Sequence, residues 1–256
     1  MIDENELSVE NVRQMKILVL SDIHANLTAL EAVLADAGSF NAAWCLGDLV
    51  GYGPDGNECV QRIRNLPNLL CIKGNHDLAI CGEADLSIFN QEAAKAILIS
   101  KDMLSAESLN FLKALPEVIA TDLATLAHGS PRNPIWEYTL DPSIAAENFE
   151  HFHTQLAFIG HTHIPLMFNL NDQDGAVARN YLLPQNTITL SQRAMLNPGS
   201  VGQPRDNDPR ASFGIFDPVA MTWEIHRVSY DIAAVQQRII EAGLPEKHAR
   251  RLSGGW

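Results

Sequence analysis

Short apolar runs recur along the chain, and several are followed by residues of the metal-ligand type. Residues 42–46 form one such run, and Gly47 and Asp48 follow it, which predicts a buried strand that ends in a tight turn. The same pattern returns at residues 18–24, 70–77, 124–128 and 158–163. Ligands collect at the carboxyl ends of strands in open α/β sheets. We therefore expect these strand ends to meet at one site.

Helical periodicity alternates with the apolar runs in the first half of the chain. Asn26 is expected to cap a helix that continues to Ala37, with Gly38 just past its end. Further helices are predicted at residues 54–64, 90–101, 105–115 and 231–243, and one begins at Asp141. Alternating strands and helices favour a parallel sheet. For the interval 78–127 the sequence leaves open whether its helices pack against the core or form a lid.

The second half of the chain changes to short strands separated by turns. Strands are predicted at residues 165–170, 176–183, 187–190, 211–216 and 221–228. This texture indicates a second, mostly antiparallel sheet. A chain of 256 residues lies within the size range of one large domain. The expected fold class is therefore α/β, with a two-sheet sandwich flanked by helices in a single domain that spans residues 1–256.

Composition narrows the classes of partner. A formal net charge of −13 opposes attraction to a nucleic-acid backbone, so a duplex partner is not expected. No apolar stretch approaches the roughly 20 residues of a membrane span, and the acidic residues 1–6 do not resemble a signal peptide. We expect a cytoplasmic protein with no membrane partner. The four cysteines lack metal-site spacing and are expected to be small buried hydrophobes.

One glycine motif is misleading. Residues 51–56 match the glycine pattern of dinucleotide-binding loops. However, Pro54 has no amide to offer a pyrophosphate, and the preceding strand already ends in Asp48. No nicotinamide cofactor is therefore expected.

The polar residues at the strand ends suit divalent metals. Asp22 and His24 lie two positions apart in a segment expected to be extended, so both side chains should face one cavity, as should His161 and His163. Carboxylate, imidazole and amide ligands together favour Mn, Fe or Zn over magnesium or calcium. The potential ligands outnumber those of one tetrahedral ion, which indicates two ions that share a carboxylate.

These residues fall into an ordered series of motifs: Asp22-Ile23-His24, Gly47-Asp48, Gly74-Asn75-His76-Asp77, His128 and Gly160-His161-Thr162-His163. The series resembles the calcineurin-like metallophosphoesterases, and residues 197–205 resemble their small stand-alone bacterial and archaeal branch. The resemblance implies one metal held by Asp22, His24, Asp48 and His163. It implies a second metal held by Asp48, Asn75, His128 and His161, with Asp48 as the bridge.

The resemblance also implies an activity. It points to hydrolysis of a small phosphomonoester or phosphodiester by a metal-bound hydroxide, with His76 as general acid rather than metal ligand. General acid help is typically worth about 10²–10⁴-fold. Asp77 would either orient the imidazole of His76 or cap a helix, and the sequence leaves both open. The alternative is a non-catalytic metal-binding or scaffold protein on the same fold, against which the complete ligand set argues. The oligomeric state is not predicted.

One departure from the family puts some activities in doubt. Protein serine/threonine phosphatases and dinucleoside tetraphosphate hydrolases carry an arginine soon after the bridging aspartate, whereas residues 49–53 here contain none. Arg132 and Arg205 are candidates to replace this phosphate clamp, and a surface role is equally open for each. A dinucleoside polyphosphate hydrolase thus remains an alternative rather than the leading hypothesis.

Other polar and aromatic residues receive structural interpretations. Trp136 and Tyr138 could stack a base, although filling the core of their own loop is the favoured interpretation. His151 and His153 copy the spacing of His161 and His163, but no glycine-led strand end precedes them, so exposed histidines are expected. His248 falls in a basic tail and is not assigned to the site.

Overall fold

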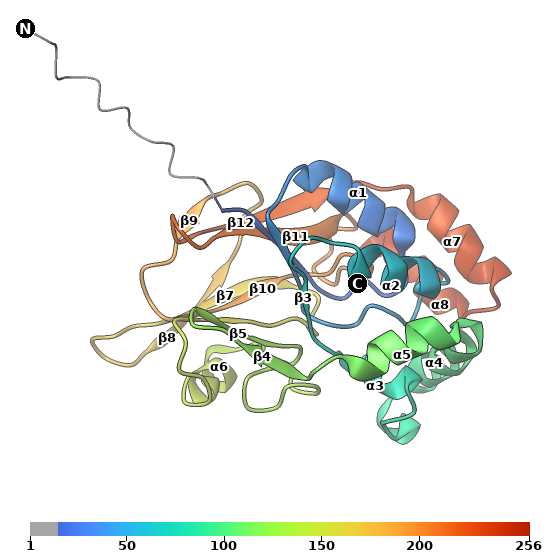
Figure 1. The fold of residues 1–256 in the computed structure, drawn as a ribbon, viewed down its shortest axis with the longest axis horizontal. Coiled ribbons are helices and arrows are strands. Elements are labelled where there is room, and N and C mark those ends of the chain that lie inside the picture. Colours follow the sequence, from blue (N-terminus) through green and yellow to red (C-terminus); the bar gives the residue numbers. More distant parts are fainter. Residues whose placement is uncertain (1–14) are drawn as a thin grey trace, which may run out of the picture.

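The computed structural model describes residues 15–256, and the acidic lead of the chain lies outside this range. Two mixed sheets of six strands lie face to face, and helices flank the sandwich (Figure 1). The prediction of a two-sheet α/β sandwich is therefore confirmed. In detail, both sheets mix parallel and antiparallel pairs, so the division into one parallel and one mostly antiparallel sheet was too simple.

The first sheet has the strand order β3-β2-β1-β11-β12-β9. Its strands are β1 (Ile17–Leu20), β2 (Ala42–Cys45), β3 (Leu70–Cys71), β9 (Ile188–Thr189), β11 (Ala211–Asp217) and β12 (Thr222–Val228). β1, β2 and β3 are parallel, as the alternation of strands and helices predicts. β11 then pairs antiparallel with β1, which places the late strands beside the first one. The carboxyl ends of the three parallel strands consequently lie together at one edge.

The second sheet has the order β4-β5-β6-β10-β7-β8. Its strands are β4 (Val118–Ala120), β5 (Ala124–Ala127), β6 (Leu156–Phe158), β7 (Pro165–Leu170), β8 (Val177–Tyr181) and β10 (Ala194–Pro198). β5, β6 and β10 are parallel, and the remaining pairs are antiparallel. β10, which the sequence analysis did not predict, lies between β6 and β7 and is buried along its whole length. It completes the core of this sheet.

Eight α-helices and one 3-10 helix occur among the described residues. They are α1 (Leu27–Ala37), α2 (Gly56–Arg64), α3 (Asn75–Ile80), η1 (Leu86–Ile88), α4 (Gln91–Met103), α5 (Ala106–Ala114), α6 (Pro142–Asn148), α7 (Ile232–Glu241) and α8 (Glu246–Gly254). Asn26 caps α1 by accepting a hydrogen bond from the Ala29 amide, as predicted. None of the helices within residues 15–256 is long and apolar enough to cross a membrane.

Aromatic side chains fill the space between the two sheets. Trp44 and Phe216 of the first sheet both contact Phe158 of the second, with ring centroids 5.2 and 5.3 Å apart. Burying such large apolar surfaces is the main favourable term in folding, at about 25 cal/mol per Å². The sheets are thereby held so that their strand ends open toward the same side, which fixes the position of the site.

The interval 78–127 packs against the core. Ile97 of α4 and Leu112 of α5 are buried in the same apolar cluster as Leu18 of β1. The two helices of this interval therefore pack against the core. The interval's contribution to the site comes from the end of η1 through the first turn of α4, where Ile88, Phe89, Asn90 and Ala93 border a cavity.

Two helices escaped prediction for different reasons. α3 begins at Asn75 within a motif that looked like a strand end, because the Gly-Asn-His-Asp series has no helical period to read. α8 was taken for a basic tail, yet Leu252 and His248 are buried, with His248 only 2% exposed. The apolar face of α8 is short, so its amphipathic pattern is weak. Its burial depends on α7 and Tyr52, which the tertiary structure supplies.

Candidate active site

The loops that follow five strands meet at one end of the sandwich. β1, β2 and β3 lead to ligand residues in the first sheet, and β5 and β6 lead to ligand residues in the second. The predicted metal ligands are all buried and converge there: Asp22, His24, Asp48, Asn75, His128, His161 and His163. The structure thus brings together the whole predicted ligand set.

The backbone at these residues is unusual. φ is positive at Asp22, His24, Asp48, His161 and His163, with values from 49° to 64°. A positive φ is uncommon outside glycine and carries a cost that the surrounding structure must offset. The expectation that the paired residues lie in extended segments was therefore wrong, although the pairs do face one cavity. Tight left-handed turns aim these side chains inward.

The ligand atoms form two groups, and Asp48 lies between them. His163 Nε2 lies 3.2 Å from Asp22 Oδ1 and 3.1 Å from His24 Nε2. In the second group, His128 Nε2 lies 3.4 Å from Asp48 Oδ2 and is also close to Asn75. Asp48 Oδ2 lies 3.7 Å from His24 Nε2 as well, so this carboxylate faces both groups.

Three of the histidines are held in the form that binds metals. The Nδ1 atoms of His24, His128 and His163 lie 3.3, 2.7 and 2.6 Å from backbone carbonyl oxygens. A carbonyl oxygen only accepts, so each Nδ1 carries the proton. Nε2 of each ring therefore faces the site, and in the neutral ring this atom offers its lone pair to a cation. Such outer hydrogen bonds fix the orientation of metal-binding imidazoles.

Two carboxylate oxygens are left without partners. Asp22 Oδ1 and Asp48 Oδ2 are buried and make no hydrogen bond within residues 15–256. The other oxygens of these carboxylates are anchored, because Asp48 Oδ1 accepts from the His76 amide at 2.8 Å and Asp22 Oδ2 accepts from the His161 amide at 3.1 Å. Buried charge without a partner is costly. The donor set therefore fits divalent cations at this place.

The electrostatics agree with this fit. Burial opposes the charged form of Asp22, but His163 and His128 outweigh it and lower the pKa of this carboxyl. Burial opposes the charge of Asp48 too, and His128 and His76 lower its pKa well below the usual value. Burial lowers the pKa of His128, but Asp48 raises it to about 9. Burial is the main cause of a lowered pKa at the other site histidines: His24, His76, His161 and His163.

His76 lies beside the ligand groups at the first turn of α3. Its ring borders the cavity, and its Nδ1 has no hydrogen-bond partner in the described part of the chain. Asp77 does not orient this ring, since its two oxygens accept from the backbone amides of Gly74 and Val50 at 3.0 and 3.3 Å. The structure thus gives Asp77 the capping role that the sequence left open. Burial and the Asp48 charge raise its pKa to about 7.

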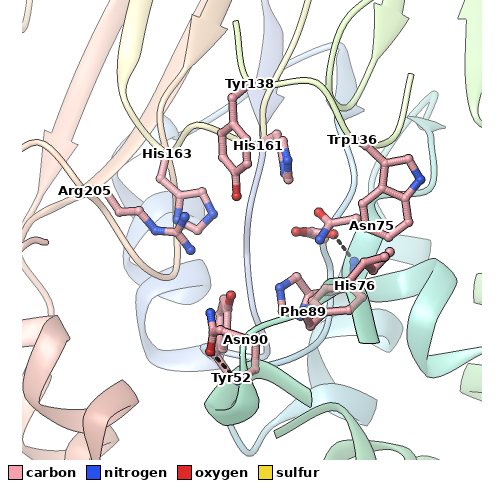
Figure 2. A pocket seen from close by; sticks show the side chains of 13 residues that line it. Tyr52, Asn75, His76, Phe89, Asn90, Trp136, Tyr138, His161, His163 and Arg205 are labelled. Atoms are coloured by element: carbon pink, nitrogen blue, oxygen red, sulfur yellow. Dashed lines mark hydrogen bonds between the residues drawn. The ribbon is translucent and has the colours of Figure 1, made fainter. Parts of the chain in front are cut away.

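A cavity of about 240 Å³ opens above the ligands. Figure 2 shows Arg205 beside His163 on one side, and Trp136 and Phe89 beside His76 on the other. The guanidinium of Arg205 donates to Gln203 Oε1 at 3.0 Å, its Nε is buried without a partner, and no carboxylate within residues 15–256 pairs with it. It is therefore a cationic group free to meet an anion.

Arg132 has a different position. Its guanidinium pairs with Glu137 at 2.5 Å and also with Glu147, and it does not line the cavity above the ligands. The structure thus separates the two arginines that the sequence treated alike.

Two residues that the sequence did not single out belong here: Tyr52, which lines the cavity, and His248. Tyr52 is 7% exposed, and its ring centroid lies 4.6 Å from that of His24 and 4.3 Å from that of His76. The ring of His248 packs behind Tyr52, 4.4 Å away. Tyr52 falls in the stretch 49–53, where an arginine was missing. Its place between Gly51 and Gly53, which let the loop turn tightly, was the available signal.

Residues 15–220 match the model of the calcineurin-like phosphoesterase superfamily domain. The chain belongs to this superfamily. Its class of chemistry is therefore hydrolysis of phosphate esters, in a metal-dependent family. The buried Asp and His groups are candidate metal ligands.

Individual relatives agree with this assignment. The chain is 45% identical to a metallophosphoesterase from Sphaerobacter thermophilus whose crystal structure covers 95% of this chain and 100% of that one, with a TM-score of 0.88. It is 42% identical to an uncharacterized protein of Methanocaldococcus jannaschii over 92% of this chain and 96% of that protein. A symmetrical bis(5'-nucleosyl)-tetraphosphatase of Pectobacterium atrosepticum is 30% identical, over only 48% of this chain and 46% of the enzyme.

Proposed function

We propose that this protein is a phosphoesterase that uses two divalent transition-metal ions, Mn, Fe or Zn, to hydrolyse a small phosphomonoester or phosphodiester. The observation that carries the proposal is the unpartnered Asp48 Oδ2, buried between two groups of nitrogen and oxygen ligands. One group would consist of Asp22, His24, Asp48 and His163. The other would consist of Asp48, Asn75, His128 and His161. Imidazole and carboxylate ligands together suit these metals.

Bound cations of this kind lower the pKa of water and neutralise phosphoryl oxygens. The chain itself supplies the remaining functions. Hydrolysis breaks the bond between phosphorus and the leaving oxygen, and an alkoxide leaves readily only when it receives a proton. His76, whose ring borders the cavity, is the residue that we assign to give this proton. An anionic phosphate beside the ring favours its protonated form.

Arg205 is proposed to hold the phosphate during the reaction. Its guanidinium borders the cavity without an acidic partner, and guanidinium groups recognise phosphate oxygens in a two-pronged geometry. The site therefore replaces the arginine missing after Asp48 by one from a distant loop. The complete buried ligand set argues against a scaffold that binds no metal, because two buried carboxylate oxygens would then lack partners. Turnover separates the enzyme from a non-catalytic metal-binding protein.

The test is turnover of p-nitrophenyl phosphate and bis(p-nitrophenyl) phosphate by the purified protein, with Mn²⁺ and with a chelator. We expect metal-dependent hydrolysis of at least one ester. Asp48→Asn should lose both the activity and the metal content measured by elemental analysis. Asp217→Asn is the matched control, because Asp217 is also buried but accepts hydrogen bonds only from the backbone amides of its own turn. Absence of turnover with metal bound would support the scaffold alternative instead. Retention of two metal equivalents by Asp48→Asn would refute the bridging role.

A further inference from the structure

Arg205 lies on one side of the cavity, and Phe89 and Trp136 lie on the other (Figure 2). Tyr138 also lines the cavity, and its ring stacks on that of His161 with the centroids 3.9 Å apart. The ring centroid of Phe89 lies 5.3 Å from that of His76 and 5.6 Å from that of Trp136. The rings of His76, Phe89 and Trp136 come from α3, from the segment before α4 and from the loop after β5. Phe89 and Trp136 thus form one aromatic wall beside His76, the proposed general acid.

Packing within the protein leaves part of the Phe89 and Trp136 surfaces unburied. Ile135 is 3% exposed and fills the core of its loop, so Trp136 remains half-buried and borders the cavity. The sequence favoured Trp136 as the residue that fills the core of this loop. Ile135 takes that position instead. Phe89 is held from behind, because it packs against two apolar clusters that include residues of α4. A ring fixed in this way loses little entropy when a ligand stacks on it.

The position of His76 decides which part of a substrate meets the wall. A general acid must lie next to the leaving oxygen. The group attached to that oxygen then extends along Phe89 and Trp136, while Arg205 on the opposite side faces the phosphate. A planar aromatic group, such as a nucleobase, stacks on ring faces of this kind with its own π-face, which is worth about 1–3 kcal/mol per base.

We propose that this wall is the subsite for the leaving alcohol, and that it selects esters whose alcohol carries a planar aromatic group, as nucleosides do. The inference rests on the proposed phosphoesterase function. It adds a substrate class to that function, which the buried ligands do not determine.

The test compares adenosine 5'-monophosphate with ribose 5-phosphate, two esters with the same leaving oxygen that differ only in the base. Each is used as a competitive inhibitor of p-nitrophenyl ester hydrolysis by the Mn²⁺-loaded protein. We expect the inhibition constant of the nucleotide to be lower by roughly 5- to 150-fold, the range that corresponds to one stacked base. Equal inhibition constants for the two compounds would overturn the proposal.

Trp136→Leu and Phe89→Leu remove a ring face and keep an apolar side chain. Each should lower the ratio of the two inhibition constants toward one and leave the value for ribose 5-phosphate unchanged. Tyr181→Leu is the control, because Tyr181 is 67% exposed on β8 and lies outside the cavity. If both variants keep the wild-type ratio of the two inhibition constants, Phe89 and Trp136 do not form the subsite for the leaving alcohol.

The two levels of proposal fail separately. If metal-loaded protein does not hydrolyse the p-nitrophenyl esters, the proposed function fails. In that case the dissociation constants of the same two compounds are measured by calorimetry. A ratio of roughly 5 to 150 supports the aromatic subsite, and a ratio near one rejects it. Turnover of the esters with a ratio near one rejects the aromatic subsite alone.

Discussion

The backbone of Gly74 lies directly against the carboxylate of Asp48. A Cβ atom built on Gly74 would lie 2.1 Å from Asp48 Oδ1 and 2.4 Å from the Asp48 amide. Contacts this short are not tolerated, and the backbone of Asp48 cannot rotate away. The loop before α3 and the loop after β2 thus approach each other only because position 74 lacks a side chain. This close approach holds the carboxylate that faces both ligand groups.

Gly74→Ala should therefore displace Asp48 and impair metal binding. Overpacking of this kind costs typically about 1–3 kcal/mol of stability, and more where backbone must move. We expect a lower unfolding temperature and less than two equivalents of bound metal by elemental analysis. Gly175→Ala is the comparison: nothing lies within 4 Å of a Cβ there, but φ is +71°, so this alanine is strained and should lower the unfolding temperature without loss of metal. Full metal content in Gly74→Ala would mean that the loops can separate without cost to the site.

His76→Ala tests the general acid. We expect metal content near wild type and a kcat lower by about 10²–10⁴-fold on esters with alkyl or sugar leaving groups. Activated p-nitrophenyl esters should be affected much less, because a nitrophenolate leaves without a proton. Equal losses on both kinds of ester would instead indicate a phosphate-binding role. Loss of metal would make His76 a ligand, which its proximity to His24 and Asp48 allows.

Arg205→Met should weaken substrate binding. A hydrogen bond to a charged group contributes about 1.5–3 kcal/mol, so we expect kcat/KM to fall by roughly 10- to 150-fold for either class of ester. The matched control is Arg132→Met, since Arg132 pairs with Glu137 and Glu147 away from the cavity. Steady-state kinetics of the two variants decide the assignment. Similar kinetics in both variants would remove Arg205 from the phosphate site.

His248 should make stability depend on acid pH. Burial lowers its pKa to about 4, with further lowering by the nearby Arg251, Arg205 and Lys247 and an opposing hydrogen bond to a backbone carbonyl. Between about pH 6.5 and pH 4 the unfolded chain therefore binds the proton that the folded chain excludes. Stability contributed by the neutral ring is present above this window and is lost as pH falls through it, at up to about 1.4 kcal/mol per pH unit.

His248→Leu should accordingly unfold with a shallower dependence on pH in this window than the wild type. Denaturant unfolding at several pH values measures the slope. His151→Leu, at an exposed position, should keep the wild-type slope. A wild-type slope in His248→Leu would mean that the buried ring does not exclude the proton.

The amino-acid sequence by itself predicted most of the strands, most of the helices and the candidate ligand residues that the fold brings together. Apolar runs ending in Asp48 or His128 are local features, and local features can be read without coordinates. Strand β10 escaped because its residues, Ala194–Pro198, include polar Asn197 and a proline. Only pairing with β6 and β7 makes them a strand.

Tertiary structure alone decided which side chains surround the ligands. Arg132 and Arg205 carry the same charge and lie in similar polar loops, so no local pattern separates them. The fold places two glutamates beside Arg132 and leaves Arg205 at the cavity. His248 looked like part of a basic tail, and it is buried because Tyr52, 196 positions earlier, lies against its ring. Contacts between distant segments depend on packing of the whole chain, which no short stretch of sequence encodes.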